Sequence, residues 1–417
     1  MLTIDQLATI PIGDICRLCD FEERWSSRLS RSDIFDLAYK LIKEVPALEK
    51  LVELELKMVP VIQDLNNLEV RFDSKKWIAS LAPISERIES LVNYFGIKGV
   101  ENVNFSEFSD QLCKLSALSF EDLNGKTKLV EERQILAREL YRKSSFMKRY
   151  AKIASDNKLS GHYVSYSAST GRMSCSKEPL MSLPKNMYNF LLPRDSFSIW
   201  RMDFKQAELR IASALSNCEN IQATLAKGND IYADFAQQFL TNESDQSVAH
   251  KLGKKLLIPY LYGAGENTLR KKLNECIPSV QDNTNIREII SKTYPELDLK
   301  LESFANTPNI RYTAYGIAPV VSSEPTKPQL MNLPIQGVGA VIIKRLLLRL
   351  RDSAKYHVLI PRHDEVIVEV PNDIDAVTVK AELSKLALDA VKSIVKNYVI
   401  ENFITIERMD CNAIKYN

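Results

Sequence analysis

"RHDEVIVEV" (residues 362–370) places Asp364 and Glu365 side by side between two apolar stretches, the first of which is "YHVLI" (356–360). The valines that follow stand at alternate positions, so the pattern predicts a strand, a tight polar turn and a second strand. Adjacent carboxylates at a turn allow two interpretations. They are either a solvated turn or oxygen ligands for a hard cation such as Mg²⁺. Other parts of the sequence are needed to distinguish a solvated turn from a metal site.

The composition is that of a globular protein, with 417 residues, 45% hydrophobic and 26% charged. This length favours two or three domains. With 55 basic and 53 acidic residues the formal net charge is +2. The overall charge therefore gives no sign of a polyanion partner, and a nucleic-acid surface would have to come from local clustering.

The seven cysteines are too few and too scattered for a disulfide framework. Their odd number favours reduced thiols, and we expect a cytoplasmic location. Cys16 and Cys19 form a CxxC pair that no second pair completes into a zinc site. The first residues do not resemble a signal peptide, and no apolar run reaches 18 residues, so no membrane association is expected.

Residues 1–160 have mainly helical spacing, and 127–158 predict a strong helix whose last third is rich in Lys and Arg. That basic face is either solvated or contacts phosphates, and the sequence leaves both open. After 160 the chain becomes irregular until "FSIWRMDF" (197–204), which is expected to be an apolar strand that ends on Asp203. Helical, charged sequence follows from 213 to about 305, and an irregular stretch covers 309–330.

Later elements are a helix at 334–355, the hairpin at 356–370, a helix at 376–399 and a terminal strand from Phe403. Strands at both ends of the second half, with a helical insert between them, predict one sheet domain interrupted by a helical one.

Asp203 and Asp364 are both expected at strand ends, from distant parts of the chain. Carboxylates from separate elements can converge on a pair of divalent ions, which activate the attacking oxygen and stabilise the leaving one in phosphoryl transfer. A third stretch, "HKLGKKLLIPYLYG" (250–263), spaces a histidine, a lysine, an isoleucine and a tyrosine four residues apart. As a helix this is one stripe. Such a stripe could bind a nucleoside triphosphate, with the phosphates at the lysine and the base near the tyrosine, although an ordinary amphipathic surface helix has the same pattern.

Six stretches together resemble the family A DNA polymerases, the bacterial polymerase I type. "DFKQAELRIASALS" is similar to motif A, "HKLGKKLLIPYLYG" to motif B and "RHDEVIVEV" to motif C. "TGRMSCSKEPLMSLP" (170–184), "GNDIYADFA" (228–236) and "NLPIQGVGA" (332–340) resemble further segments of the family. They occur in the family's order, and the resemblance covers roughly residues 50–417.

The resemblance implies an α+β, right-hand polymerase fold with a helical thumb, an antiparallel-sheet palm and helical fingers. The expected segments are an N-terminal helical extension at 1–50, the thumb at 51–165, the palm at 166–212 and 319–417, and the fingers at 213–318.

The resemblance also implies a metal site. Asp203 and Asp364 would hold two Mg²⁺ ions, for which Mn²⁺ could substitute. The carbonyl of Phe204 would be a further ligand, and Glu365 an auxiliary catalytic carboxylate. Lys254 would be catalytic as well, because it neutralises the triphosphate of the incoming dNTP.

Further roles follow residue by residue from the same resemblance. Glu208 would be the steric gate against a ribose 2′-OH, and Tyr262 would lie beside the templating position. The nucleotide side as a whole would comprise Tyr232, His250, Lys254, Ile258, Glu208 and Tyr262. Arg172, Asn332 and Gln336 would read the minor groove at the primer terminus, where all base pairs share an acceptor pattern. His363 would lie by the primer-terminal phosphate.

Four positions depart from the family pattern. Motif B opens with His250, a titratable cation, where the family has Arg. Ile258 replaces an aromatic residue, and Tyr232 replaces a histidine. Pro259 replaces a glycine, and inside a helix it costs about 3 kcal/mol or causes a kink. All four concern nucleotide selection and leave the reaction class unchanged.

The function so implied is a template-directed DNA polymerase that extends a primer 3′ end with dNTPs and lacks a proofreading exonuclease. Its partners would be primer–template DNA and dNTPs, with a processivity or replisome partner left open. A single-subunit RNA polymerase is disfavoured by Glu208. A catalytically weak or inactive DNA-binding accessory protein, derived from a polymerase, is disfavoured by the intact Asp203, Asp364 and Lys254.

Overall fold

The computed structural model describes most of the chain outside one long central gap. The described residues are 2–19, 30–44, 46–80, 157–168, 170–178, 180–240, 245–277, 285–306 and 326–409. They fall into two compact units. One comprises Met1–Leu68, Gly161–Ser182 and Asp195–Met409, and the other Glu69–Ser160, Leu183–Arg194 and Asp410–Asn417. Across the described ranges, no helix is long and apolar enough to cross a lipid bilayer.

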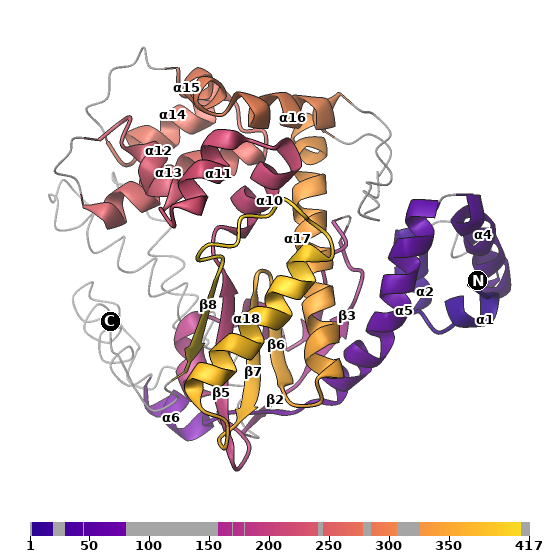
Figure 1. Ribbon diagram of the computed structural model, residues 1–417. Helices are drawn as coiled ribbons and strands as arrows, with labels where there is room; N and C mark the ends of the chain where they lie inside the picture. The colour runs from indigo at the N-terminus through magenta and orange to yellow at the C-terminus, as the bar shows by residue number, and fades with distance from the viewer. Residues whose placement is uncertain are drawn as a thin grey trace, which may run out of the picture. The chain divides into compact units, whose positions relative to one another are not determined.

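A four-stranded antiparallel sheet is the centre of the first unit (Figure 1). Its strands are β5 (Phe197–Phe204), β6 (His357–Arg362), β7 (Glu365–Pro371) and β8 (Ile404–Arg408), in the order β6-β7-β5-β8. Trp200 pairs with Val368 and Met202 with Val366 across the ladder, so these side chains share one apolar face. The sequence predicted both the hairpin and β5.

Pro361 belongs to β6. This strand lies at the edge of the sheet, where a residue without an N–H group is tolerated. Two helices pack against the sheet, α17 (Lys327–Asp352) beside β6 and α18 (Ala376–Lys392) beside β8.

Helix α17 begins seven residues before the predicted start at 334, in a stretch expected to be irregular. The reason is a capping box, in which Thr326 and Gln329 satisfy each other's backbone N–H groups. Pro328 at the helix start is also compatible with the first turn. Pro334 lies inside the helix and does not end it. The sequence prediction was therefore wrong about where this helix begins.

The helical insert consists of seven helices that the structure describes between β5 and α17. They are α10 (Ala207–Ser216), α11 (Glu219–Ala226), α12 (Ile231–Ala236), α13 (Gln246–Leu261), α14 (Glu266–Asn274), α15 (Ile286–Thr293) and α16 (Pro295–Ala305). Three of them begin with side-chain caps, from Asp230, Asp245 and Asn285. Helix α13 packs closely on α12, and α16 packs on α17. Figure 1 shows these helices gathered beyond one end of the sheet.

The packing of α13 on α12 depends on Gly253. A Cβ atom at this position would lie 1.9 Å from the backbone oxygen of Tyr232. We expect Gly253→Ala to destabilise the fold by about 1–3 kcal/mol, because the backbones would have to separate. The control is Gly13→Ala, also in a helix, where the new Cβ meets only the Arg17 side chain at 3.5 Å. Calorimetry should show a lower Tm for Gly253→Ala alone, and equal melting of both variants would contradict the packing argument.

The N-terminal region folds as four described helices, α1 (Ile4–Leu7), α2 (Ile12–Leu18), α4 (Arg31–Glu44) and α5 (Pro46–Asn67). Their apolar faces form a core that also includes Tyr166. Cys16 and Cys19 are buried free thiols in this core, and burial raises the pKa of Cys19 to about 12. Both cysteines thus contribute to packing.

One buried ion pair joins α5 to α17. Lys344 on α17 pairs with Glu55 on α5, and both side chains are at most 2% exposed. Ser165 Oγ donates a second hydrogen bond to Glu55 Oε2 at 2.5 Å. The ammonium of Lys344 also lies 5.1 Å from the centroid of the Tyr166 ring. The N-terminal helices are thus tied to the helix that supports the sheet.

The second unit is described only in part. It contains β1 (Val70–Arg71) paired with β2 (Lys158–Leu159), the helix α6 (Ser74–Ala79) and the 3₁₀ helix η4 (Lys185–Phe190). An aromatic cluster of Phe72, Trp77 and Phe190 forms its described core. The predicted basic helix at 127–158 lies outside the described residues, apart from its last two positions. Lys158 belongs to β2, so the prediction was wrong at that position.

Candidate active site

The hairpin tip and the end of β5 are held together by the backbone. A two-residue turn, His363 and Asp364, joins β6 to β7. His363 has φ of 48°, in the left-handed region that histidine enters more often than most residues. The N–H of Phe204 donates to the carbonyl oxygen of Asp364 at 3.0 Å. Asp203 lies opposite Glu365 in the ladder. Asp203 and Asp364 are therefore brought to the ends of adjacent strands, as the sequence predicted.

The carboxylates at this edge repel one another. Burial raises the pKa of Asp364, and the charges of Asp203 and Glu208 raise it further. A hard divalent cation would relieve this repulsion. No cluster of three or more His, Cys, Asp or Glu that could hold a metal occurs among the described residues. Two carboxylates are nevertheless a donor set that suits Mg²⁺, which is usually held by one or two carboxylates together with water and substrate phosphates.

Glu365, expected as an auxiliary carboxylate, is engaged within the sheet. Its side chain is 4% exposed, and its Oε2 lies 3.3 Å from a guanidinium nitrogen of Arg201. The same nitrogen lies 3.7 Å from Asp203 Oδ2. Arg201 was not among the residues predicted from the sequence. The signal was present, since residues 201 and 203 of a strand point to the same face.

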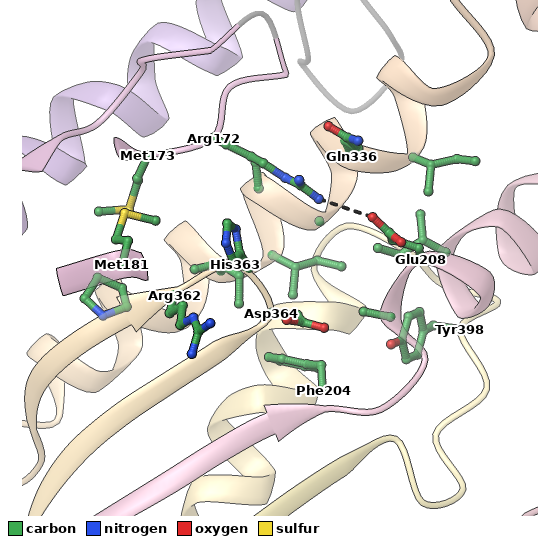
Figure 2. Close-up of a pocket in the computed structure, with 18 residues that line it drawn as sticks. Arg172, Met173, Met181, Phe204, Glu208, Gln336, Arg362, His363, Asp364 and Tyr398 are labelled. Atoms are coloured by element: carbon green, nitrogen blue, oxygen red, sulfur yellow. Dashed lines mark hydrogen bonds and ion pairs between the residues drawn. The ribbon is translucent and has the colours of Figure 1, made fainter. Parts of the chain in front are cut away.

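A pocket of about 350 Å³ opens beside the hairpin tip. Figure 2 shows the side chains that line it. Expected site residues contribute much of the polar lining, and apolar side chains such as Ile211, Ile335 and Met173 contribute the rest. The expected residues that line it are Arg172, Phe204, Glu208, Gln336, His363 and Asp364. Burial and the nearby arginines Arg172 and Arg362 lower the pKa of His363, which favours a neutral imidazole.

Hydrogen bonds connect Glu208 to two other parts of the site. Tyr262, at the end of α13, donates its hydroxyl proton to Glu208 Oε1 at 2.7 Å. Gln336 on α17 donates to the Tyr262 oxygen at 2.7 Å. Arg172 approaches the same Glu208 oxygen at 3.5 Å, as the dashed line in Figure 2 marks. Burial and Glu208 raise the pKa of Tyr262 to about 12, so the tyrosine remains a donor at neutral pH.

Three residues of the predicted stripe, His250, Lys254 and Ile258, lie within α13, and Tyr262 is the residue that caps its C-terminus. The helix runs to Leu261 with Pro259 in its last turn, so the proline does not break the helix before Tyr262. Lys254 is exposed, and Ile258 is half-buried. No carboxylate of the described residues forms an ion pair with Lys254. None of His250, Lys254 and Ile258 lines the pocket.

His250 and Tyr232 belong to a second polar group, centred on Asp230. Asp230 Oδ2 lies 2.5 Å from His250 Nδ1, and Asp230 Oδ1 accepts from Gln206 at 2.8 Å. The Tyr232 ring meets the His250 ring edge-on, at 5.2 Å between centroids. Asn332, on α17, is buried and lies outside the pocket lining, and its Nδ2 has no hydrogen-bond partner within the described ranges.

The model of DNA polymerase family A matches residues 109–396. Since this is more than half of the chain, the chain belongs to DNA polymerase family A. Among curated relatives, DNA polymerase I of Deinococcus radiodurans is 26% identical over 252 residues, which cover 55% of this chain and 26% of that protein. The thermostable DNA polymerase I of Thermus aquaticus is 23% identical over 246 residues, covering 53% and 29%. DNA polymerase I of Lactococcus lactis subsp. cremoris is 23% identical over 280 residues, covering 60% and 31%.

The chain therefore spans about a quarter to a third of the length of these relatives. A solved structure of the POL domain of Pol1 from M. smegmatis, in complex with DNA primer–template and dNTP, superimposes with a TM-score of 0.69. It covers 90% of this chain and 73% of that one at 16% identity. This likeness confirms the expected α+β polymerase fold.

Proposed function

We propose that this chain is a template-directed DNA polymerase that extends a primer 3′ end with dNTPs by two-metal-ion phosphoryl transfer. The observation that carries the proposal is the convergence of Asp203 and Asp364 at adjacent strand ends, next to a pocket lined by Glu208 and His363. Membership of the family agrees with it. The partners we propose are primer–template DNA and dNTPs.

Asp203 and Asp364 would hold Mg²⁺, or Mn²⁺ in its place, and we propose the Phe204 carbonyl as an additional ligand. When bound there, the metal ions supply activation of the attacking oxygen and stabilisation of the leaving group. The protein's own task is then to place the substrates. Lys254 is exposed on α13 and carries no competing ion pair among the described residues, which suits it to bind a triphosphate.

On the nucleotide side we propose that the sugar lies against Glu208, which Tyr262 and Arg172 hold in one orientation. His250, Ile258 and Tyr232 remain proposed contacts to the nucleotide. On the DNA side, Arg172, Asn332 and Gln336 are proposed to read the primer terminus. His363, neutral at the hairpin tip, would donate one hydrogen bond to the terminal phosphate without adding charge.

Primer extension with single dNTP omissions tests the proposal. Purified protein with Mg²⁺ and primer–template should stop at the template position that requires the omitted nucleotide. With all dNTPs withheld, a mismatched 3′ end should stay intact, because we expect no proofreading by this chain. Extension with NTPs instead would indicate an RNA polymerase. Tight DNA binding without any extension would indicate the accessory protein.

Glu208 supplies a prediction on sugar selection. Glu208→Ala should reduce the preference for dNTPs over rNTPs on the order of ten-fold or more, because it opens the space for a 2′-OH. Glu208→Gln keeps the volume and can still accept from Tyr262, so its preference should remain close to that of the wild type. The measured quantity is the ratio of kcat/KM for a dNTP and the matching rNTP.

The control for this prediction is Glu219→Ala, which removes an exposed glutamate from α11. If Glu208→Ala and Glu219→Ala show the same ratio, the steric-gate role of Glu208 is wrong.

A further inference from the structure

Arg201 lies among three carboxylates of the sheet. One of its terminal nitrogens is 2.7 Å from Glu407 Oε1 on β8. The other is 3.3 Å from Glu365 Oε2 on β7 and 3.7 Å from Asp203 Oδ2 on β5 itself. The guanidinium is thus shared between the proposed metal ligand Asp203 and an acidic residue on each flanking strand.

The register of the sheet explains this arrangement. Asp203 pairs directly with Glu365, and like charges in such positions destabilise an antiparallel pair. Arg201 pairs with Glu407 on the other side, and it lies diagonally from Glu365. A cation on the central strand therefore offsets repulsion that the ladder itself creates.

The cluster is also partly shielded from water. The side chain of Arg201 is 20% exposed and that of Glu365 is 4% exposed, whereas Glu407 is 51% exposed. Charge–charge interactions are stronger in such a setting than in bulk water. The contacts of Arg201 with Asp203 and Glu365 should therefore outweigh its pair with Glu407, which solvent screens.

We propose that Arg201 is a positioning residue that fixes Asp203 and Glu365 and sets the affinity of the site for divalent cations. This inference rests on the proposed two-metal function. The guanidinium shares the charge of Asp203 with any metal ion bound there, so it holds the ligand in place and weakens metal binding at the same time. Glu365 acts through Arg201, because its carboxylate is engaged by the guanidinium.

If Arg201 both anchors the carboxylates and weakens metal binding, its removal should raise the affinity for Mn²⁺ and lower the kcat of primer extension. Arg201→Gln removes a positive charge a few ångströms from Asp203, so Mn²⁺ should bind more tightly, on the order of ten-fold. The kcat for primer extension at saturating metal should fall, because the carboxylates lose their common anchor. A merely structural role predicts weaker metal binding together with lower kcat. Arg201→Lys keeps the charge without the planar fork, so its metal affinity should stay near the wild-type value.

The experiment titrates Mn²⁺ into the protein and follows free Mn²⁺ by electron paramagnetic resonance, with kcat measured separately in Mg²⁺. A second variant, Glu407→Gln, alters an exposed side chain and spares the fold. It leaves the Arg201 charge less compensated, so Mn²⁺ should bind about two- to three-fold more weakly. That change has the opposite sign to the change in Arg201→Gln, and it remains measurable if Arg201→Gln does not fold.

The inference is overturned if folded Arg201→Gln binds Mn²⁺ no more tightly than the wild type, or if Glu407→Gln leaves the affinity unchanged. The wild type and Asp203→Ala distinguish this from failure of the proposed function. The proposed function fails, and the inference with it, if the wild type does not extend a primer and also shows no Mn²⁺ binding that Asp203→Ala abolishes. If the wild type does both, a wrong sign in the variants overturns the role of Arg201 alone.

Discussion

Asp203→Ala and Asp364→Ala are each expected to abolish primer extension, with a loss in kcat on the order of a thousand-fold or more. Each substitution removes one of two carboxylates, which lie at the adjacent ends of β5 and of the β6–β7 hairpin. A neutral side chain cannot hold a divalent cation there, and the remaining carboxylate alone cannot position two. Single-turnover extension at saturating DNA measures the chemical step without a contribution from product release.

Binding of primer–template should survive both substitutions, because the residues that we propose to contact DNA are others, namely Arg172, Asn332, Gln336 and His363. Fluorescence anisotropy with a labelled duplex separates this from catalysis. Asp373→Ala is the matched control, since it removes an exposed aspartate from the turn after β7. A variant of Asp203 or Asp364 that retains more than a few per cent of the wild-type rate would falsify the two-metal assignment.

Local patterns predicted the sheet and its hairpin well. The alternation after Glu365 corresponds to β7, and the apolar run before Asp203 corresponds to β5. Residues 365–370 of β7 are buried on both faces, and a register shift by one residue would exchange the valine face for the face that carries Glu365 and Glu369, so the alternation still specifies the register. The start of α17 differs from the prediction because Thr326 and Gln329 form a capping box before Pro334, which lies inside the helix.

Pairings across long sequence separations could not be predicted from local pattern. The bond between Tyr262 and Glu208 joins residues 54 apart, and the pair of Arg201 with Glu365 joins residues 164 apart. The sequence placed Glu208 and Tyr262 in separate roles, whereas the structure joins them through one hydrogen bond. Strand register and helix packing set such distances, and neither can be read from a single stretch of sequence. The proposed segment boundaries, including the thumb at 51–165, stay predictions.

The buried pair of Lys344 and Glu55 leads to the last prediction. Lys344→Met should destabilise the protein by about 3–5 kcal/mol, because it leaves the Glu55 carboxylate buried without a counter-charge. Both side chains are at most 2% exposed, so water cannot replace the lost ammonium group. The bond from Ser165 to Glu55 at 2.5 Å remains, but a neutral hydroxyl does not balance a charge. Chemical unfolding of the two proteins measures the difference in free energy of unfolding.

A second ion pair between the same two helices provides the control. Arg351 on α17 bonds to Asp64 on α5 at 2.6 Å, with side chains 43% and 61% exposed. Arg351→Met should cost less than about 1 kcal/mol, because solvent already screens that pair. The double variant Lys344→Met with Glu55→Leu should recover most of the loss, since apolar side chains can replace a buried ion pair at little cost. If Lys344→Met costs no more than Arg351→Met, or if the double variant is as unstable as the single one, burial of the unpaired Glu55 charge is not what destabilises the protein.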